Sequence, residues 1–271
     1  MSQDAIVQTK TKRSEIIATD PDWIVAERSV TPFPVTTDAD LWDGVAPFEH
    51  HERLFDPVPA YPPIDWRERA ALFPARDQRP CESCTAHAIA SVMSDLQAVR
   101  AWPSRGPLSP GFIHACVGAA DCATTVRPDF LLTRLVAQAV PAATAKDHPF
   151  DPADCKAALA SGRVRVAGPF ERAWGAMEAQ RTLQRGPILA IMDAYADFWE
   201  WYGGGVYAPT GAGPSRQHAV AVVGFGPGHW IIKNSLGSGW GMLGYAKVQA
   251  ETCRLLTEGG FPGYVFDIAP A

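Results

Sequence analysis

The hydrophobic positions of this chain change their spacing about halfway along it. In the first half they recur at helical intervals, and after Gln78 they mark one face of a predicted helix that begins at or next to Cys84. The apolar positions of this face are Cys84, Ala88, Ile89, Val92, Met93, Leu96 and Val99. A second helix is predicted over Leu108–Gly118, where Ser109 can cap its start, and a third over Pro128–Val140.

The second half of the chain has mostly strand-like spacing. One more helix is predicted over Glu171–Arg185, and Gly186 with Pro187 ends it. Short runs rich in β-forming residues follow, bounded by glycine and proline. They are ILAIM, HAVAVVGF, HWIIKNS, GYAKVQ and GYVFDI. Helices first and strands afterwards predict an α+β protein.

The first 60 residues differ from the rest. They are polar at first and then interrupted by many prolines, and only Asp22–Val30 has the composition of a strand. Three interpretations stay open for residues 1–60: a loose tail, a prosegment, or a strap across a cleft. The body of the protein is therefore predicted to be residues 61–271.

Composition limits the classes of function. The chain has 271 residues, 47% of them apolar, which is enough for a sizeable core. Its net charge is −5 and it has no basic cluster, which argues against nucleic acid or an anionic membrane as partner. No apolar run is long enough to span a membrane, and the N-terminus lacks the apolar region of a secretory signal. The initiating Met1 then favours a cytoplasmic location.

Cys84 is the first candidate for chemistry. The unpaired N–H groups and the dipole of a helix N-terminus favour negative charge, so a thiol there loses its proton more readily. The side-chain amide of Gln78 could donate to an oxygen that develops charge beside the sulfur. Taken alone, a cysteine in such a helix is more often an apolar core residue. Two residues well downstream, His218 and Asn234, favour a nucleophilic role for Cys84 over a core role. A nucleophilic thiol needs a base and a group that orients the base.

Three stretches resemble the papain family of cysteine peptidases. DQRPCESCTAHA resembles its nucleophile segment, QHAVAVVGFG its histidine segment, and IIKNSLGSGWGMLGY its asparagine segment. The resemblance covers about residues 61–271. It implies a papain-like α+β fold with the active-site cleft between two lobes: a helical lobe over about 75–165 and a β-barrel-like antiparallel lobe over about 166–271.

The resemblance also implies an activity and roles for four residues. The chain would hydrolyse peptide or protein substrates through a Cys84 thioester, with no cofactor and no metal. His218 would be base and then acid, paired with Cys84 as thiolate and imidazolium. Asn234 would orient the imidazole. Gln78 and the backbone N–H of Cys84 would form the oxyanion hole.

Some positions depart from the family pattern. Glu82 stands where glycine is usual, Thr85 replaces a usual tryptophan, and Leu236 replaces the tryptophan that covers the His–Asn hydrogen bond. Trp240 remains and is expected to give partial cover. Two alternatives to hydrolysis stay open: a papain-like acyltransferase or ligase in peptide maturation, or a catalytically silent binding module. The presence of Cys84, His218, Asn234 and Gln78 argues against the silent module.

Substrate preference follows from the same alignment. Glu258 would sit at the floor of the pocket for the side chain two positions before the cut bond, with Ile191 and Ala219 on its walls. Glu82 at the cleft rim would add to the negative electrostatic potential from Glu258. The pocket would therefore accept Arg or Lys. The alternative for Glu258 is a solvated surface glutamate.

The other cysteines bear on the compartment. Resemblance to the family would pair Cys81 with Cys122 and Cys116 with Cys155, leaving Cys253 without its usual partner. Disulfides do not normally persist in a reducing cytosol, so these pairs leave an oxidising compartment open against the cytoplasmic expectation. Zinc is a weaker interpretation, because Cys81 and Cys84 make the only close CxxC pair. The oligomeric state is not set by the sequence.

Overall fold

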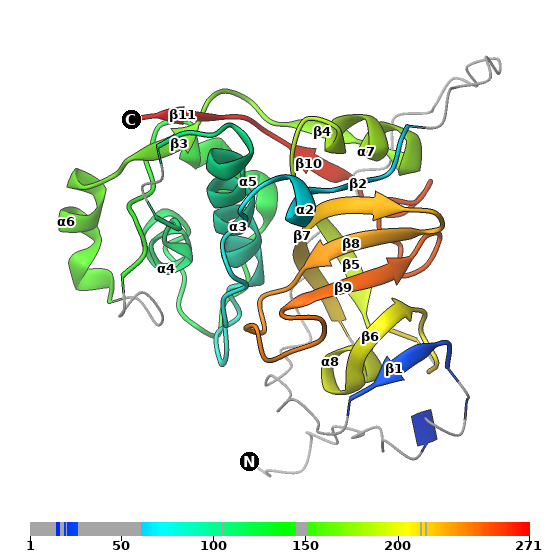
Figure 1. Cartoon of the computed structure of the whole chain (residues 1–271). Helices are drawn as coiled ribbons and strands as arrows, with labels where there is room; N and C mark the ends of the chain where they lie inside the picture. Colours follow the sequence, from blue (N-terminus) through cyan, green and yellow to red (C-terminus); the bar gives the residue numbers. More distant parts are fainter. Residues whose placement is uncertain are drawn as a thin grey trace, which may run out of the picture.

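The structure is a computed structural model, and it describes residues 15–16, 19, 21–26, 61–103, 106–144, 151–211, 213–214 and 216–271. Within these ranges a group of helices lies beside a large twisted sheet (Figure 1). The C-terminal strand β11 (Ile268–Pro270) leaves the sheet and pairs with β3 (Val164–Val166) on the helical side. The exact lobe boundaries stay a prediction.

The helical part is built around α3 (Cys84–Val99), which begins at the residue that the sequence predicted. The other elements here are α4 (Pro110–Phe112), the π-helical η1 (Ile113–Val117), α5 (Pro128–Leu135), the 3-10 turn η2 (Pro152–Asp154) and α6 (Cys155–Ala160). The Ser109 cap is confirmed, because its hydroxyl accepts the Phe112 N–H at 2.9 Å. Among the described residues, no helix is both long and apolar enough to cross a bilayer.

Nine of the eleven described strands form one sheet in the order β1-β6-β9-β8-β7-β5-β10-β4, with β2 beside β7. Its strands are β1 (Trp23–Val25), β2 (Ile64–Asp65), β4 (Glu171–Ala173), β5 (Ile188–Ala194), β6 (Tyr202–Tyr207), β7 (Arg216–Gly226), β8 (His229–Lys233), β9 (Tyr245–Gln249) and β10 (Gly263–Val265). The pairings are antiparallel except β6 with β9. The sheet is open within the described ranges, so the expected barrel-like lobe is only a loose description.

Three short helices accompany the sheet: α2 (Trp66–Arg69), α7 (Gly175–Leu183) and α8 (Ala196–Trp201). The helix predicted over Glu171–Arg185 is therefore wrong in its first turn. Glu171–Ala173 instead pairs antiparallel with β10, and the helix starts only at Gly175, whose φ of +70° suits glycine. The helix predicted over Pro128–Val140 ends at Leu135 for a similar reason, since Val140 forms a bridge with Val164.

Strands β5 and β7 at the centre of the sheet position the site. Both are buried over most of their length and pair in register, with Ile191 opposite Ala219 and Met192 opposite His218. Alternate side chains serve two hydrophobic clusters, so Ile191 and Ala219 pack in the same cluster as Cys84 while Met192 packs in the other. Because α3 packs directly on β7, the first turn of the helix lies against the first residues of the strand.

A short part of the N-terminal segment belongs to the sheet. β1 lies within the predicted strand Asp22–Val30 and pairs antiparallel with β6 at the sheet edge (Figure 1), whereas residues 27–30 lie outside the described ranges. Trp23 is buried, its ring centroid is 5.3 Å from that of Tyr207, and its indole N–H donates to the Ala208 carbonyl at 3.0 Å. This edge strand is therefore anchored by an aromatic side chain.

Both disulfides implied by the resemblance are present. Cys81 is bonded to Cys122 and Cys116 to Cys155, while Cys253 is a buried free thiol. The expectation of a cytoplasmic location is therefore wrong. Structural disulfides form and persist in oxidising compartments and are rare in the reducing cytosol.

Candidate active site

Cys84 is the first residue of α3 and is fully buried. The loop before it is held in place from the helical side. Cys81 is tied to Cys122 by the disulfide, and the Glu82 N–H donates to the Cys122 carbonyl at 3.0 Å. The sulfur is therefore presented at a helix N-terminus by a braced loop, as the sequence predicted.

His218 and Asn234 form the second half of the site. His218 lies near the start of β7, and Asn234 follows directly after β8. Asn234 Oδ1 lies 2.8 Å from His218 Nε2 and also accepts the Ser235 N–H at 2.8 Å, which fixes the amide orientation. Nε2 is then the donor, so in a neutral ring Nδ1 is the basic nitrogen. That nitrogen is buried and has no hydrogen-bond partner among the described residues.

Cys84 packs in the same buried cluster as Ala219, the residue that follows His218 on β7. The backbone N–H of Ala219 faces Cys84 and favours a negative charge on its sulfur. Burial raises the pKa of the Cys84 thiol, although the Arg216 charge and this N–H act in the opposite direction. Burial lowers the pKa of His218 to about 3, against the hydrogen bond that His218 donates to Asn234, which raises it. Burial therefore favours the neutral thiol and the neutral imidazole in this closed arrangement, and the expected thiolate–imidazolium pair stays a prediction.

Gln78, the expected oxyanion donor, is buried in the loop before Cys84, and its role stays a prediction. Its Nε2 donates to the Cys81 carbonyl at 2.9 Å, and its Oε1 accepts the Ser235 hydroxyl. These contacts orient the amide. Since a primary amide carries two N–H donors, the contact with Cys81 uses only one of them. Ser235 therefore links Gln78 to Asn234, its neighbour in the chain.

Sequence reasoning missed Trp199, on α8. Its ring packs edge-on against the His218 imidazole with centroids 4.4 Å apart. Leu236 is buried but offers no aromatic face, and Trp240 acts indirectly by donating its indole N–H to the Trp199 carbonyl at 3.1 Å. The aromatic cover thus comes from another part of the chain. A helix as short as α8 has no periodic signal that could have revealed it.

Glu82 is not the exposed rim charge that the sequence predicted. Its side chain is 2% exposed and that of Arg216 is 11% exposed, and the two form a bidentate ion pair. Arg216 therefore compensates the Glu82 charge, and the expected bias of the field toward basic substrates is not supported. The pair is formed between the nucleophile loop and the first residue of β7.

The proposed pocket residues are only partly brought together. Ile191 and Ala219 face each other across β5 and β7 in the cluster that contains Cys84. Glu258 is exposed, and its Cγ lies against Gly175 at the start of α7. Its assignment to the floor of a substrate pocket gains no contact from the structure and stays a prediction.

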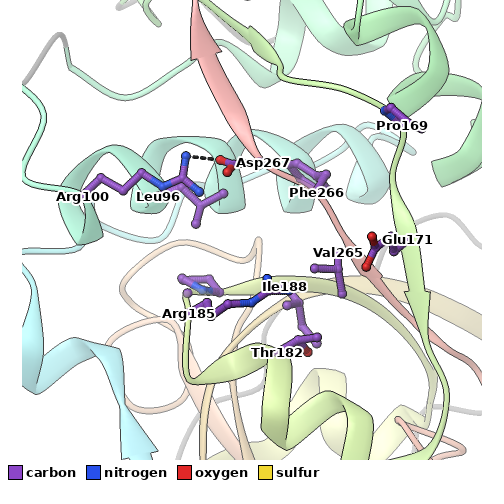
Figure 2. Close-up of a pocket in the computed structure, with 12 residues that line it drawn as sticks. Leu96, Arg100, Pro169, Glu171, Thr182, Arg185, Ile188, Val265, Phe266 and Asp267 are labelled. Atoms are coloured by element: carbon purple, nitrogen blue, oxygen red, sulfur yellow. Dashed lines mark ion pairs between the residues drawn. The ribbon is translucent and has the colours of Figure 1, made fainter.

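A cavity of about 210 Å³ lies elsewhere (Figure 2). It is lined by the last turn of α3 at Leu96 and Arg100, by the end of α7 and by the β10–β11 link. Leu96 is twelve residues beyond Cys84, about 18 Å along the helix axis. This cavity is therefore separate from the candidate active site. No group of three or more His, Cys, Asp or Glu side chains in the described ranges is arranged to hold a metal.

Comparisons with known proteins agree with this geometry. Macrodontain-1 of Ananas macrodontes is 26% identical over 198 residues, 69% of this chain and 88% of that protein. Cathepsin K of Gallus gallus is 29% identical over 215 residues, 73% of this chain and 63% of that protein, so the chain spans less than two thirds of that relative.

Solved structures share the fold. Digestive procathepsin L2 proteinase of Tenebrio molitor has a TM-score of 0.65 at 23% identity, over 88% of this chain and 77% of that chain. The bromelain protease of Ananas comosus, in complex with the E64 inhibitor, has a TM-score of 0.61 at 22% identity. The match covers 75% of this chain and 97% of that chain. The sequence profile described as papain family cysteine protease matches residues 61–261, which is most of this chain. The chain therefore belongs to the papain family of cysteine proteases and is a cysteine peptidase.

Proposed function

We propose that Cys84, His218, Asn234 and Gln78 carry out peptide-bond hydrolysis through a thioester. The observation that supports this most is the arrangement of the imidazole. Asn234 Oδ1 accepts the His218 Nε2–H at 2.8 Å, and Cys84 packs in the same buried cluster as Ala219, the residue after His218. The basic Nδ1 is therefore left for the thiol proton.

The steps follow from these positions. His218 Nδ1 takes the proton of Cys84 as the sulfur attacks the peptide carbonyl carbon, and the charge on the carbonyl oxygen is stabilised by Gln78 and the Cys84 N–H. The imidazolium then gives that proton to the leaving amine, and the C–N bond breaks to leave a thioester. Water, deprotonated by the same imidazole, attacks the thioester and releases the acid and the free thiol.

The closed site has to open before this can happen. Cys84 and His218 are 0% and 1% exposed, so a substrate carbonyl cannot reach the sulfur without side-chain movement. Admission of a polar peptide and water reduces the desolvation that favours the neutral form of both groups. Proton transfer from thiol to imidazole then creates two opposite charges in contact, each favouring the other.

The N-terminal segment is proposed to act as a prosegment or strap. Support comes from β1, which adds to the sheet edge through β6, and from the fit of this chain to digestive procathepsin L 3 of Tenebrio molitor over 96% of its length at a TM-score of 0.62. Removal of residues 1–58 should leave a stable fold with unchanged or higher peptidase activity. If the truncated chain does not fold, the segment is part of the core instead.

The test of the proposed function compares two cysteine variants. Cys84→Ala should abolish hydrolysis of a fluorogenic peptide, whereas Cys253→Ser, which changes the other free thiol, should retain it. Retention of activity by Cys84→Ala would refute the assignment.

Product analysis separates hydrolysis from the alternatives. With an added amine nucleophile, a hydrolase releases mainly the free acid, whereas the acyltransferase alternative predicts mainly the new amide. A binding module would form neither product and no thioester.

A further inference from the structure

The nucleophile and the base of the site belong to different parts of the molecule. Cys84 begins α3, and His218 lies on β7. The position of one relative to the other depends on contacts between the helix and the sheet. Glu82 and Arg216 form an ion pair at that junction, and each lies two residues before one of the catalytic side chains.

We propose that the Glu82–Arg216 ion pair is a positioning element that holds the Cys84 loop and the His218 strand in register. The inference rests on the proposed function of Cys84 and His218. Arg216 Nη1 lies 3.2 Å from Glu82 Oε1, and Nη2 contacts Oε2. A bidentate pair of this kind fixes the relative orientation of its two partners as well as their distance.

Both partners are themselves held. Glu82 lies beside the Cys81–Cys122 disulfide, and its N–H donates to the Cys122 carbonyl at 3.0 Å. The Arg216 guanidinium lies over the Trp199 ring at 5.8 Å, and it is this ring that packs edge-on against His218. Contacts therefore run without a break from the disulfide through the ion pair and Trp199 to the imidazole.

The arrangement also links departures from the family pattern that looked unrelated in the sequence. Glu82 stands in the place of a glycine, and Leu236 in the place of the tryptophan that covers the His–Asn pair. A carboxylate at 82 gives Arg216 a partner, and Arg216 stacks on Trp199, which supplies the aromatic cover that Leu236 lacks. The ion pair and the substitute tryptophan thus support each other.

The test is a double-mutant cycle in a Cys253→Ser background, in which Cys84 is the remaining free thiol among the described cysteines. Glu82→Gln, Arg216→Met, Arg216→Lys and the Glu82→Gln/Arg216→Met double variant are compared. Two readouts are measured across pH: kcat and KM for a neutral peptide, and the rate of Cys84 alkylation by iodoacetamide, which needs no substrate. Asp129→Asn, which breaks a bidentate pair with Arg127 away from the site, is the matched control.

Positioning predicts a loss of tenfold or more in kcat for Glu82→Gln and Arg216→Met, with KM within about threefold. The double variant should be no slower than the worse single variant, because either change already removes the pair. Arg216→Lys should have a higher kcat than Arg216→Met, because lysine keeps the positive charge but cannot make the bidentate contact. The pH profile of alkylation should move with kcat in these variants and stay unchanged in Asp129→Asn.

Three results would overturn the proposal. Faster alkylation and higher kcat in the variants would make the pair a gate over the sulfur. If the fold losses in kcat of the two single variants multiply in the double variant, the two residues act independently. Losses equal to those of Asp129→Asn would make the pair a structural contact only. Failure of the proposed function is recognised separately, as an absence of peptide hydrolysis in the unaltered chain while its Cys84 is still alkylated.

Discussion

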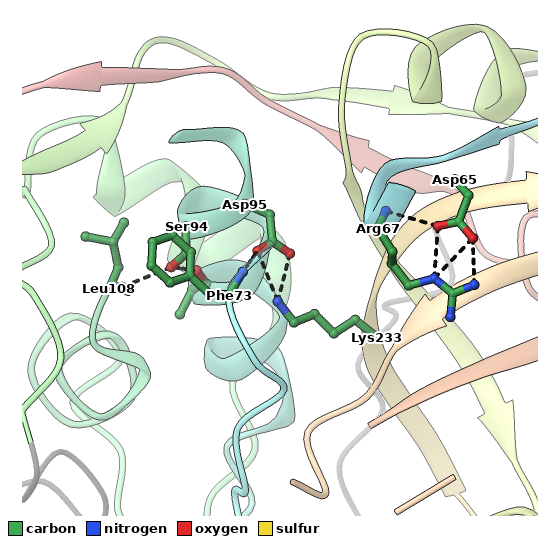
Figure 3. Close-up of polar contacts among 8 residues, drawn as sticks. Asp65, Arg67, Phe73, Ser94, Asp95, Leu108 and Lys233 are labelled. Carbon is green, nitrogen blue, oxygen red and sulfur yellow. Dashed lines mark hydrogen bonds and ion pairs between the residues drawn. The ribbon is translucent and has the colours of Figure 1, made fainter. Parts of the chain in front are cut away.

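The buried ion pair between Lys233 and Asp95 gives a sharp prediction about how the catalytic residues are held. Asp95 lies on α3, which carries Cys84, and Lys233 directly precedes Asn234 (Figure 3). Lys233 Nζ is 2.8 Å and 3.0 Å from the two Asp95 carboxylate oxygens, and the side chains are 1% and 0% exposed. Burial raises the pKa of Asp95, against the charge of Lys233.

Lys233→Met removes one charge and leaves the other buried. We expect a loss of about 3–5 kcal/mol in the free energy of unfolding, because the remaining carboxylate has lost its compensating charge. Asp95 Oδ1 also accepts the Phe73 N–H at 3.1 Å, so Asp95→Asn is the better second change because it keeps this acceptor. The Asp95→Asn/Lys233→Met double variant should be more stable than Lys233→Met by about 1–3 kcal/mol.

The assay is urea unfolding followed by fluorescence, with the disulfides intact. A lower midpoint at an unchanged slope reports a loss of stability alone. The reasoning is refuted if Lys233→Met costs less than about 1 kcal/mol, or if the losses from the two single changes add in the double variant, since either result would mean that the two charges do not depend on each other.

Three further predictions concern the site. Since burial lowers the pKa of His218 to about 3, its stabilising effect is present above pH 6.5 and is lost as pH falls toward 3, so the chain should lose about 2 kcal/mol between pH 6.5 and 4.5 relative to His218→Gln. A resting imidazolium would give the opposite sign. Trp199→Ala should lower kcat by about 2- to 13-fold, since an edge-to-face pair contributes about 0.5–1.5 kcal/mol. Trp199→Phe keeps an aromatic ring and should lower kcat by less. Equal losses of kcat in the two variants would exclude a role for the ring. Glu258→Ala should lower kcat/KM selectively for a substrate with Arg two positions before the cut bond only if Glu258 lines that pocket, and an equal effect on a Leu substrate would remove the assignment.

The parts of the fold that the sequence predicted best have a strong local signal. The face of α3 repeats over sixteen residues, and β5, β7, β8 and β9 are apolar runs closed by glycine or proline, so they were found with nearly correct bounds. The contact between His218 and Asn234 was implied by the resemblance to the papain family, and the structure has it as a 2.8 Å hydrogen bond.

The parts that were missed depend on contacts distant in sequence. Glu171–Ala173 has a composition that suits a helix, and it becomes a strand only because β10 returns beside it. Arg216 carries no motif, and its partner Glu82 lies 134 residues earlier in the chain. Trp199 sits on a helix too short to be recognised, and its contact with His218 exists only once α8 is placed against β7.

The effect of burial on the charges of the site has no signal in the sequence. A cysteine at a helix N-terminus beside a histidine predicts an ion pair when the groups are judged by their neighbours. Burial acts on both groups together and opposes both charges, and no sequence pattern shows how completely Cys84 and His218 are covered.

The central claim is that Cys84 is the nucleophile, and peptide-level mass spectrometry after incubation with an active-site epoxide tests it most directly. The full chain and the chain without residues 1–58 are both labelled, alongside Cys84→Ala and Cys253→Ser. The account predicts one adduct per chain, on the peptide that contains Cys84, unchanged in Cys253→Ser and absent in Cys84→Ala. An adduct that survives Cys84→Ala, or no adduct in either form of the unaltered chain, would contradict it.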